Sequence, residues 1–376
     1  MKDMRGEVLE KRVFERKKAS SSKGLKDNCP RLRFPEFGSD WKEVKIGDIL
    51  RIRHGRDYKK ESNINKKYPV LGSGGIITHI DSYLCNWDCV CIGRKGTINK
   101  PIFMNTPFWA VDTLFYSKSE IHEHPKFQFY LFETINWMLY NSATGVPSLT
   151  TSVIENIKRF IPTFPEQKKI ANFLTLIDKR IDKQKELIKI LKKYKKGVLY
   201  KVFSNFNKWQ KLEVKSIAKV KTGSSNTQDN NPKGIYPFYI RSVYISHSDK
   251  YIYDGEAVLT IGDGQIGKVY HYINGKFDCH QRVYMITDFT RVSGKYFYYF
   301  FSTFFYDRAM KMSAKNTVDS VRMDMISEMP IYFPDHKEQL RIVSTLDLVD
   351  SSIEKNNNLF NKLLNYKQGL LQKMFM

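Results

Sequence analysis

The sequence predicts an α+β chain of two pseudo-repeated globular units and two long helices that pack together as a coiled coil. Three observations support this prediction. A 38-residue helical segment occurs twice, the text before each copy also repeats, and each repeat changes from strand-like to helical patterning before its long helix. The predicted order along the chain is globular unit, helix, globular unit, helix.

The helical repeat covers residues 166–203 and 338–375. The copies align without a gap at an offset of 172 (338 − 166), and 16 of the 38 positions are identical, against about 2 expected from background composition. Apolar residues recur at spacings of 3 and 4, which predicts a long amphipathic helix of about 57 Å in each copy. The matched positions expected on the buried face, for helix pairing and partner docking, are Ile170, Leu174, Ile177, Ile181, Leu191 and Tyr194, with Ile342, Leu346, Val349, Ile353, Leu363 and Tyr366 in the second copy.

One seam position of this helix pair is polar in both copies. Gln184 and Asn356 stand where the apolar spacing continues. A polar residue at a seam can fix the register of two helices at a cost in stability. A local break in the seam is the alternative interpretation.

The charge balance indicates a polyanionic partner. The chain has 62 Lys and Arg against 39 Asp and Glu, a formal net charge of +23, and such an excess favours nucleic acid. Membrane binding is the competing explanation, but no run of residues approaches 18 apolar side chains, and the first 18 residues contain no apolar signal core. We therefore expect a cytoplasmic protein without a membrane partner.

The cysteine count agrees with a reducing compartment. An odd number without a regular framework argues for free thiols. The group Cys85, Cys89 and Cys91 could bind zinc, but the run CVCIG is strand-like and apolar, so core packing is the favoured interpretation. We expect no metal site in the chain.

The globular text repeats at a similar offset. WKEVKIGDILRIRHG from Trp41 matches WQKLEVKSIAKVKTG from Trp209, and alternation at the end of each predicts a strand that stops at Gly55 or Gly223. Aromatic-rich helical text and a proline-containing strand follow in both units. The predicted segments are an N-terminal extension (1–29), a first globular unit (30–165), a first spacer helix (166–203), a second globular unit (204–334) and a second spacer helix (335–376).

Two segments resemble catalytic motifs, but neither has all the features that its motif requires. GDGQIGKV from Gly262 resembles a phosphate-binding loop, but Val269 stands where Ser or Thr is required, and strand-like text follows. Asp350, Glu354 and Lys355 have a nuclease-like order, yet they lie on the long helix in the charge pattern of a solvated face. The sequence therefore predicts a non-catalytic protein.

The loops at the ends of the predicted strands carry side chains suited to reading bases. Arg and Lys suit guanine, whereas Asn and Gln suit adenine, and the two units place different sets on the same scaffold. In the first unit the predicted DNA-binding residues are Arg53, His54, Arg56, Lys59, Arg94, Lys95 and Thr97. In the second unit they are Lys221, Thr222, Ser224, Asn226, Gln228, Asp263, Gln265, His280, Gln281 and Arg282.

With these features in place, the chain resembles the specificity (S) subunit of type I restriction-modification enzymes. The resemblance covers residues 30–376 and rests on the duplicated layout, the opening RLRFPEFGSDWKEVKIGDI, the IGDGQIGKV corner, and the helix starts EQKKIANFLTLIDKRID and EQLRIVSTLDLVDSSIE. It implies two target recognition domains, each reading one half of a split sequence in double-stranded DNA, with the two long helices antiparallel. It also implies that two methyltransferase (M) subunits dock on the helices and domains, that restriction (R) subunits join, and that S-adenosylmethionine, ATP and magnesium belong to those partners.

Two other functions remain as alternatives. One is a stand-alone DNA-acting enzyme, such as a nuclease with an unrecognised active site, and the other is a structural protein that binds nucleic acid without sequence choice. The bases recognised, the gap between half-sites and the loop residues that touch bases do not follow from the sequence, because loop geometry and DNA shape both contribute.

Overall fold

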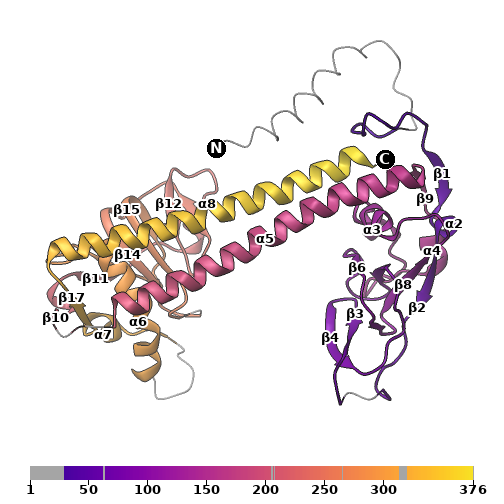
Figure 1. Cartoon of the computed structure of the whole chain (residues 1–376). Helices are drawn as coiled ribbons and strands as arrows, with labels where there is room; N and C mark the ends of the chain where they lie inside the picture. Colours follow the sequence, from indigo (N-terminus) through magenta and orange to yellow (C-terminus); the bar gives the residue numbers. More distant parts are fainter. Residues whose placement is uncertain are drawn as a thin grey trace, which may run out of the picture. The chain divides into compact units, whose positions relative to one another are not determined.

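The computed structural model describes residues 29–61, 64–204, 206, 208–264, 266–312 and 320–375. The chain divides into two compact units. Unit 1 takes the chain up to Lys183 together with Phe360 and the residues that follow it, and unit 2 runs from Gln184 to Leu359. Each unit therefore contains one globular domain and parts of both long helices (Figure 1).

Unit 1 combines three small sheets with helices. A two-stranded sheet pairs β1 with β9, a four-stranded sheet has the order β2-β8-β5-β6, and a three-stranded sheet has the order β4-β3-β7. The elements are β1 (Lys42–Lys45), α2 (Ile46–Ile49), β2 (Leu50–His54), β3 (Tyr68–Gly72), β4 (Gly75–Ile80), β5 (Cys89–Gly93), β6 (Ile102–Met104), β7 (Trp109–Ala110), β8 (Leu114–Ser119), α3 (Pro125–Glu133), η2 (Trp137–Tyr140), α4 (Thr151–Glu155), β9 (Lys158–Ile161) and α5 (Phe164–Val202).

Unit 2 repeats this plan with one larger sheet. Strands β10 and β17 form the two-stranded sheet, and the main sheet has the order β11-β16-β14-β15-β12-β13. The elements are β10 (Gln210–Glu213), η3 (Val214–Ser216), β11 (Lys219–Thr222), η4 (Thr227–Asp229), β12 (Tyr236–Tyr239), β13 (Ile245–Ser248), β14 (Tyr253–Ile261), β15 (Tyr270–Cys279), β16 (Val283–Thr287), α6 (Gly294–Met312), α7 (Met323–Ser327), β17 (Pro330–Phe333) and α8 (His336–Met374). Sheets and helices in both units confirm the predicted α+β class.

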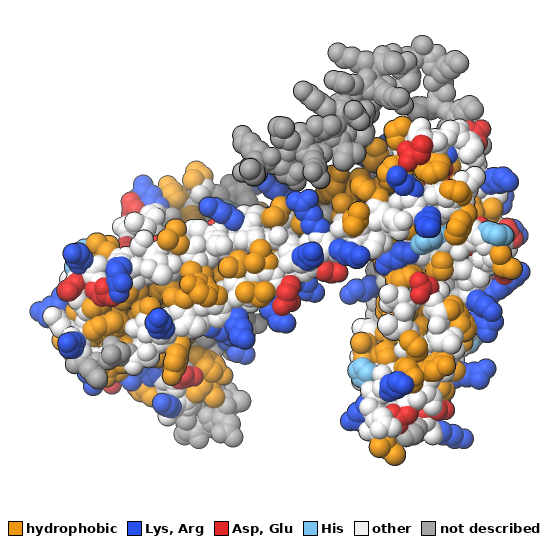
Figure 2. Space-filling view, viewed as in Figure 1, with side chains coloured by type: hydrophobic (Ala, Val, Ile, Leu, Met, Phe, Trp, Pro, Cys, Tyr) orange, Lys and Arg blue, Asp and Glu red, His pale blue; other side chains and the backbone are white. Residues whose placement is uncertain are grey.

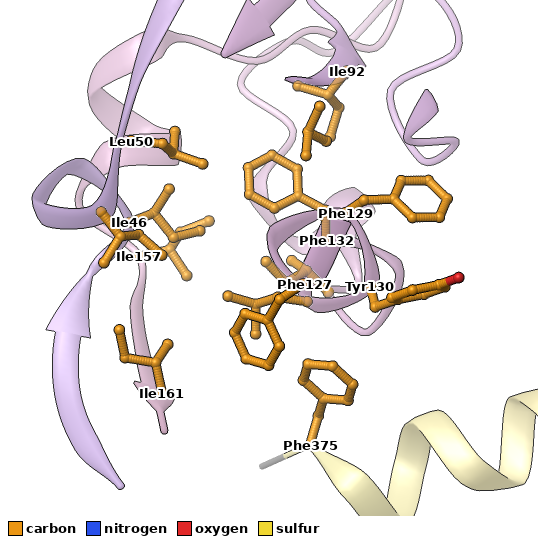
Figure 3. Close-up of a cluster of buried hydrophobic side chains, with 14 of the residues drawn as sticks. Ile46, Leu50, Ile92, Phe127, Phe129, Tyr130, Phe132, Ile157, Ile161 and Phe375 are labelled. Carbon is orange, nitrogen blue, oxygen red and sulfur yellow. The ribbon is translucent and has the colours of Figure 1, made fainter. Parts of the chain in front are cut away.

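The core of unit 1 forms around α3. Its side chains Phe127, Phe129, Tyr130 and Phe132 belong to one buried cluster with isoleucine and leucine residues of α2, β2, β5 and β9. Figure 3 shows Phe129 and Tyr130 pointing away from Ile46, Leu50 and Ile161, on the other side of α3. Helix α8 completes this core, because Phe375 stacks on Phe127 with ring centroids 5.3 Å apart. In unit 2 the equivalent residue is Phe203, directly after α5, and its ring centroid lies 5.9 Å from that of Tyr296 and 5.4 Å from that of Phe300.

The two long helices form as the repeat predicts. Helix α5 begins at Phe164 and α8 at His336, each within two residues of the expected start. Ile181 and Leu363 are buried in unit 1, and Ile188 of α5 is buried in unit 2. The prediction that the apolar face of each long helix packs on the other helix is incomplete. Ile170 and Leu174 of α5 pack in the core of unit 1, and Ile342 and Leu346 of α8 pack in the core of unit 2.

Polar contacts between the helices repeat with the sequence. In unit 1 the Tyr130 hydroxyl donates to Asp178 Oδ2 (2.7 Å), and Lys367 Nζ lies 2.8 Å from Asp178 Oδ1. In unit 2 the equivalent Tyr299 donates to Asp350 Oδ2 (2.8 Å), and Lys195 Nζ lies 2.6 Å from Asp350 Oδ1. The interpretation of Asp350 as part of a solvated face is therefore wrong, because this residue of α8 contacts Lys195 of α5 and Tyr299 of α6. In both units a residue of α5 meets a residue far along α8, and the helices are antiparallel, as the resemblance implies.

The polar seam residues contact each other directly. Gln184 Nε2 donates to Asn356 Oδ1 (2.8 Å) and to the Asn356 carbonyl oxygen (3.1 Å). This geometry favours the register interpretation over a break, because a shift of either helix would leave a half-buried amide without its partner.

Two expectations about helix faces are wrong. Tyr194 and Tyr366 are 59% and 50% exposed, so neither belongs to the buried face, although their spacing matches it. The spacing of apolar residues does not show where along each helix the apolar face stops being buried. Ile177, Leu191, Val349 and Ile353 are half-buried.

The cysteines of unit 1 are core residues. Cys85, Cys89 and Cys91 are fully buried in an apolar cluster with Phe108 and Leu114, which confirms the packing interpretation. The neighbouring thiol of Cys89 and burial raise the pKa of Cys85. Within the described residues, no group of three or more His, Cys, Asp or Glu is placed to hold a metal ion. In the same part of the chain, no helix is long and apolar enough to cross a bilayer.

Candidate nucleic-acid interface

The predicted DNA-binding residues of unit 1 come together at one edge of the sheets. Strand β2 ends at His54 and strand β5 ends at Gly93, and both run into loops that hydrogen-bond to the turn between β7 and β8. Arg56 N donates to Ala110 O (2.8 Å), and Arg94 N donates to Thr113 O (2.8 Å). Residues 53–56 and 94–97, far apart in sequence, therefore flank the same short turn.

Unit 2 builds a similar edge with similar bonds, of which one is equivalent, since Gly55 N donates to Leu114 O (3.2 Å) as Gly223 N donates to Val283 O. Gly223 N donates to Val283 O (3.0 Å), Ser225 N to Cys279 O (3.2 Å), and Gly262 N to Arg282 O (2.8 Å). The loops after β11 and β14 thus flank the β15–β16 turn, as their counterparts flank the β7–β8 turn.

Equivalent glycines allow this close approach. A Cβ added at Gly55 would lie 2.0 Å from Val111 O, and one added at Gly223 would lie 2.0 Å from Cys279 O. Any side chain would push the loop away from the turn, so both repeats require glycine at this point.

A third loop joins the edge in each unit. The β3–β4 hairpin of unit 1 reaches the loop after β5, because a Cβ at Gly96 would lie 3.2 Å from Ser73 Oγ. In unit 2, Arg241 of the β12–β13 hairpin pairs with Asp263 of the loop after β14, with Nη1 3.2 Å from Oδ1. In unit 1 the candidate interface therefore consists of the loop after β2, the tip of the β3–β4 hairpin, the loop after β5 and the β7–β8 turn. In unit 2 it consists of the loop after β11, the tip of the β12–β13 hairpin, the loop after β14 and the β15–β16 turn. We call each of these sets the loop edge.

Charge at the loop edge of unit 2 is arranged around one carboxylate. Asp263 accepts from Arg282 Nη1 (2.6 Å) as well as from Arg241. Burial opposes ionisation of Asp263, but the hydrogen bonds from Arg282 and Arg241 outweigh it and lower the pKa of this carboxyl. Burial, followed by the charges of Arg241 and Arg282, lowers the pKa of His280, so its imidazole is neutral near pH 7.

The Type I restriction modification DNA specificity domain is the family model that matches this chain, over residues 38–193 and again over residues 207–365. The chain belongs to this family. The two matches follow the internal repeat, so each type I specificity domain comprises a globular domain and most of the long helix that follows it.

Individual relatives carry the same description. The MjaVIII specificity subunit of Methanocaldococcus jannaschii is 25% identical over 235 residues, which covers 51% of this chain and 52% of that protein. The EcoDI specificity subunit of Escherichia coli is 27% identical over 149 residues, 39% of this chain and 32% of that protein. The chain thus spans about half of the first relative and about a third of the second in these alignments.

Solved structures share the fold of this specificity-domain chain. A type I restriction-modification S subunit from M. genitalium superposes with a TM-score of 0.66 at 15% identity, covering 93% of this chain and 99% of that one. A chain from a study of complex assembly and conformational transition in a type I restriction-modification system gives 0.53 at 14% identity, covering 90% and 98%. At this identity the likeness is one of fold, and it agrees with two domains and two long helices.

Most predicted DNA-binding residues lie exposed or half-exposed at the loop edges. Lys and Arg side chains are spread over the visible face of each unit (Figure 2). Arg53 also lies over the Trp87 ring, 5.7 Å from its centroid. The exposed residues are Arg53, His54, Arg56, Lys59, Lys95, Lys221, Thr222, Ser224, Gln228, Gln281 and Arg282, and the half-exposed ones are Arg94, Thr97, Asn226 and Asp263.

At Asn226 the backbone N–H donates to Asp229 Oδ2 (2.7 Å) and the carbonyl oxygen accepts from Asp229 N (3.0 Å), so the backbone of this residue holds the start of η4. One predicted residue is buried instead of open. His280 is 6% exposed, and its Nδ1 accepts from Arg282 N (3.1 Å). The expectation of an open side chain is therefore wrong for His280, whose backbone N–H also donates to Tyr239 O of β12 (3.0 Å). Gln265 and the N-terminal extension up to residue 28 lie outside the described residues.

Sequence reasoning missed the hairpins altogether. YPVLGSGGIITHI from Tyr68 and YPFYIRSVYISHS from Tyr236 align without a gap at an offset of 168 (236 − 68), with Tyr, Pro, Ile and His matched. That match is the signal by which the hairpins could be found. It is a weak signal, because the tip is rich in glycine in the first copy and polar in the second.

Proposed function

We propose that this chain is the DNA-recognition subunit of a type I restriction-modification complex and that each domain reads one half of a split target in double-stranded DNA. The single observation that carries the proposal is the duplicated loop edge. Similar backbone bonds and the same glycine hold loops with different exposed side chains. One scaffold with two sets of loop residues suits two different half-sites.

The chemistry of the loops supports sequence reading. Arg53, Arg56 and Lys95 in domain 1 are donors suited to guanine N7 and O6 in the major groove. Gln228 and Gln281 in domain 2 can pair with adenine N6 and N7. We therefore expect the half-site of domain 1 to depend on guanine and that of domain 2 to depend on adenine.

The helices carry the second part of the proposal. Helices α5 and α8 are each continuous over 39 residues, which supports a role in setting the number of unread base pairs between the half-sites. Exposed apolar residues along α5, including Ile190 and Tyr194, are suited to docking two methyltransferase subunits. Lengthening both helices by equal whole turns should change the gap, and an unchanged gap would remove this role.

We assign the chemistry to partners. Methylation would occur on the methyltransferase subunits with S-adenosylmethionine, and cleavage would occur on the restriction subunits with ATP and magnesium. This chain would supply only the choice of sequence. Cleavage or methylation of DNA by the purified chain alone would overturn that assignment and favour a stand-alone enzyme.

The decisive experiment is a domain exchange. Residues 209–330 are replaced by the same segment of a relative, the chain is expressed with its methyltransferase subunit, and methylated adenines are mapped across the genome. We expect one half of the methylated sequence to change while the other half stays. A change in both halves would contradict separate reading, and methylation or binding without sequence preference would favour a non-specific nucleic-acid-binding protein.

A further inference from the structure

The hairpin at each loop edge carries exposed apolar side chains at matching positions. In unit 1, Ile76 and Ile77 of the β3–β4 hairpin are 63% and 55% exposed. Their counterparts in unit 2 are Tyr244 and Ile245, which are 80% and 48% exposed, and Val243 beside them is 59% exposed. Consecutive exposed apolar residues are unfavourable in water and indicate a contact surface.

The two hairpins are built alike. Tyr68, Pro69 and Val70 of β3 face Ile80, His79 and Thr78 of β4. Their counterparts in β12 and β13 pair in the same register. The register then differs at the tip, because Leu71 pairs with Ile76 after a bulge in unit 1, whereas Tyr239 pairs with Ile245 in unit 2. The exposed apolar residues therefore lie at the same end of both hairpins, although the tips differ in sequence and pairing.

The surroundings of each tip are polar and basic. In unit 2, Arg241 lies next to the apolar run and is linked through Asp263 to Arg282. In unit 1 the tip packs against the loop that carries Arg94 and Lys95. An apolar tip ringed by arginine and lysine suits a ligand with both phosphates and flat apolar surfaces, and duplex DNA is such a ligand.

The tip of unit 1 can also come close to its ligand. A Cβ at Gly74 or Gly75 would meet nothing within 4 Å, and Gly75 has a φ of 118°. The backbone at these two glycines is therefore uncovered beside the exposed Ile76 and Ile77.

We propose that the hairpin tips are apolar wedges that enter the duplex and unstack a base step in each half-site, through Ile76 and Ile77 in domain 1 and Tyr244 in domain 2. This inference rests on the proposed function, and it adds a second mode of reading. Steps that unstack at low cost, such as pyrimidine–purine steps, would be preferred even where no side chain forms a hydrogen bond. Specificity would then come partly from DNA deformability.

The test uses the full chain with its methyltransferase subunit and a duplex that carries the mapped target. 2-Aminopurine, whose fluorescence rises when it is unstacked, replaces one base at a time at positions that are not methylated. We expect a rise in each half-site with the unaltered chain. Tyr244→Ser should abolish the rise in the half-site of domain 2 only, and the double variant Ile76→Ser with Ile77→Ser should abolish it in the other half only.

Affinity and matched variants sharpen the test. Tyr244→Ser should weaken binding to the target about tenfold, the scale of one lost stacking contact, whereas Tyr244→Phe should retain both affinity and fluorescence. Ile121→Ser is the matched control, because Ile121 is 84% exposed and follows the opposite end of β8.

The outcomes separate the two proposals. Sequence-specific binding without a rise in fluorescence at any unmethylated position, or with a rise that all variants keep, would overturn the wedge and leave the proposed function intact. Absence of specific binding by the unaltered complex would overturn the proposed function itself. Failure of the variants to copurify with the methyltransferase subunit would assign the tips to a protein interface and would also overturn the wedge.

Discussion

The starts of the two long helices share the sequence Glu-Gln but use the glutamate differently. In unit 1, Glu166 is fully buried and accepts two hydrogen bonds from Arg33, both of 2.7 Å. In unit 2, the Glu338 side chain is 34% exposed and pairs with Arg341 one turn along the same helix. Only the buried pair joins the helix to a distant segment of the chain.

The glutamines, in contrast, do the same work in both units. Gln167 donates to Pro162 O (3.0 Å) and accepts from His124 N (3.1 Å). Gln339 donates to Pro334 O (3.0 Å) and accepts from Ser293 N (3.1 Å). Each glutamine fastens the helix start to the preceding strand and to the segment that begins α3 or α6. In the repeated Glu-Gln, the glutamine makes equivalent hydrogen bonds in both units, whereas the contacts of the glutamate depend on which segment of the chain covers it.

Removal of the buried glutamate should give the largest effect. Glu166→Ala leaves the Arg33 guanidinium largely buried without its partner, which should lower the free energy of unfolding of unit 1 by about 3–5 kcal/mol. Glu338→Ala removes a surface pair worth about 0.5 kcal/mol. Chemical denaturation followed by hydrogen exchange in each unit measures both changes, and equal losses would contradict the contrast between the two glutamates.

The paired glycines should come next, and here the units should behave alike. Gly55→Ala and Gly223→Ala each force a carbonyl and a Cβ apart, at a cost of about 1–3 kcal/mol. Each variant should also disturb recognition of one half-site only, which mapping of methylated adenines would show. Gly145→Ala is the control, since an added Cβ there would meet nothing within 4 Å.

Loss of either glutamine should cost a similar amount in its own unit. Gln167→Ala and Gln339→Ala each leave a buried carbonyl and a half-buried N–H without this partner, at a cost of about 1–3 kcal/mol. Thermal unfolding with hydrogen exchange at each helix start measures the effect, and Gln372→Ala, at an exposed position of α8, provides the baseline. A large loss in one unit alone would show that the two contacts are not equivalent.

Replacing the polar seam residues Gln184 and Asn356 should have a smaller effect on stability. Either single replacement should lower stability, whereas the double replacement should not. Gln184→Leu or Asn356→Leu alone should destabilise the helix pair by about 1 kcal/mol, because the remaining amide loses its partner. The double replacement should restore or raise stability while weakening the choice of register. A double-mutant cycle by denaturation measures the coupling, and additive single effects would exclude a direct contact.

The smallest expected difference between the two domains is in how the stability of their loops depends on acidic pH. The pKa of Asp263 is lowered, so its contribution to stability is present above the ordinary aspartate pKa of about 3.9 and is lost as pH falls through the lower value in the folded state. Domain 1 has Arg94 at the equivalent position. Below about pH 4, hydrogen exchange in the loop after β14 should therefore rise while the loop after β5 shows no such step, and Asp263→Asn should remove the step in domain 2.

The sequence alone revealed elements that depend on local periodicity. The long helices, the strands that end at Gly55 and Gly223, and the aromatic helices α3 and α6 all follow from spacing and turn residues. The candidate site followed partly for the same reason: glycines mark where strands end, and loops there carry the exposed side chains.

Other features depended on contacts between distant segments. Unit 2 has one continuous strand, β15, that joins β14 to β12, whereas unit 1 divides that path into β6 and β7 on either side of Pro107. The pattern of alternation did not show which of these would occur. Nor did it show that His280 is buried or that Arg241 reaches Asp263.

By itself the sequence determined that a domain and a helix occur twice, because 16 identities at one constant offset record a duplication whatever the fold. Tertiary structure alone decided which copy of a shared residue is buried, which side chains line each loop edge and which apolar residues remain uncovered. The physical reason is that periodicity fixes only the face on which a side chain lies. What covers that face is supplied by chain segments more than a hundred residues away, as Arg33 covers Glu166.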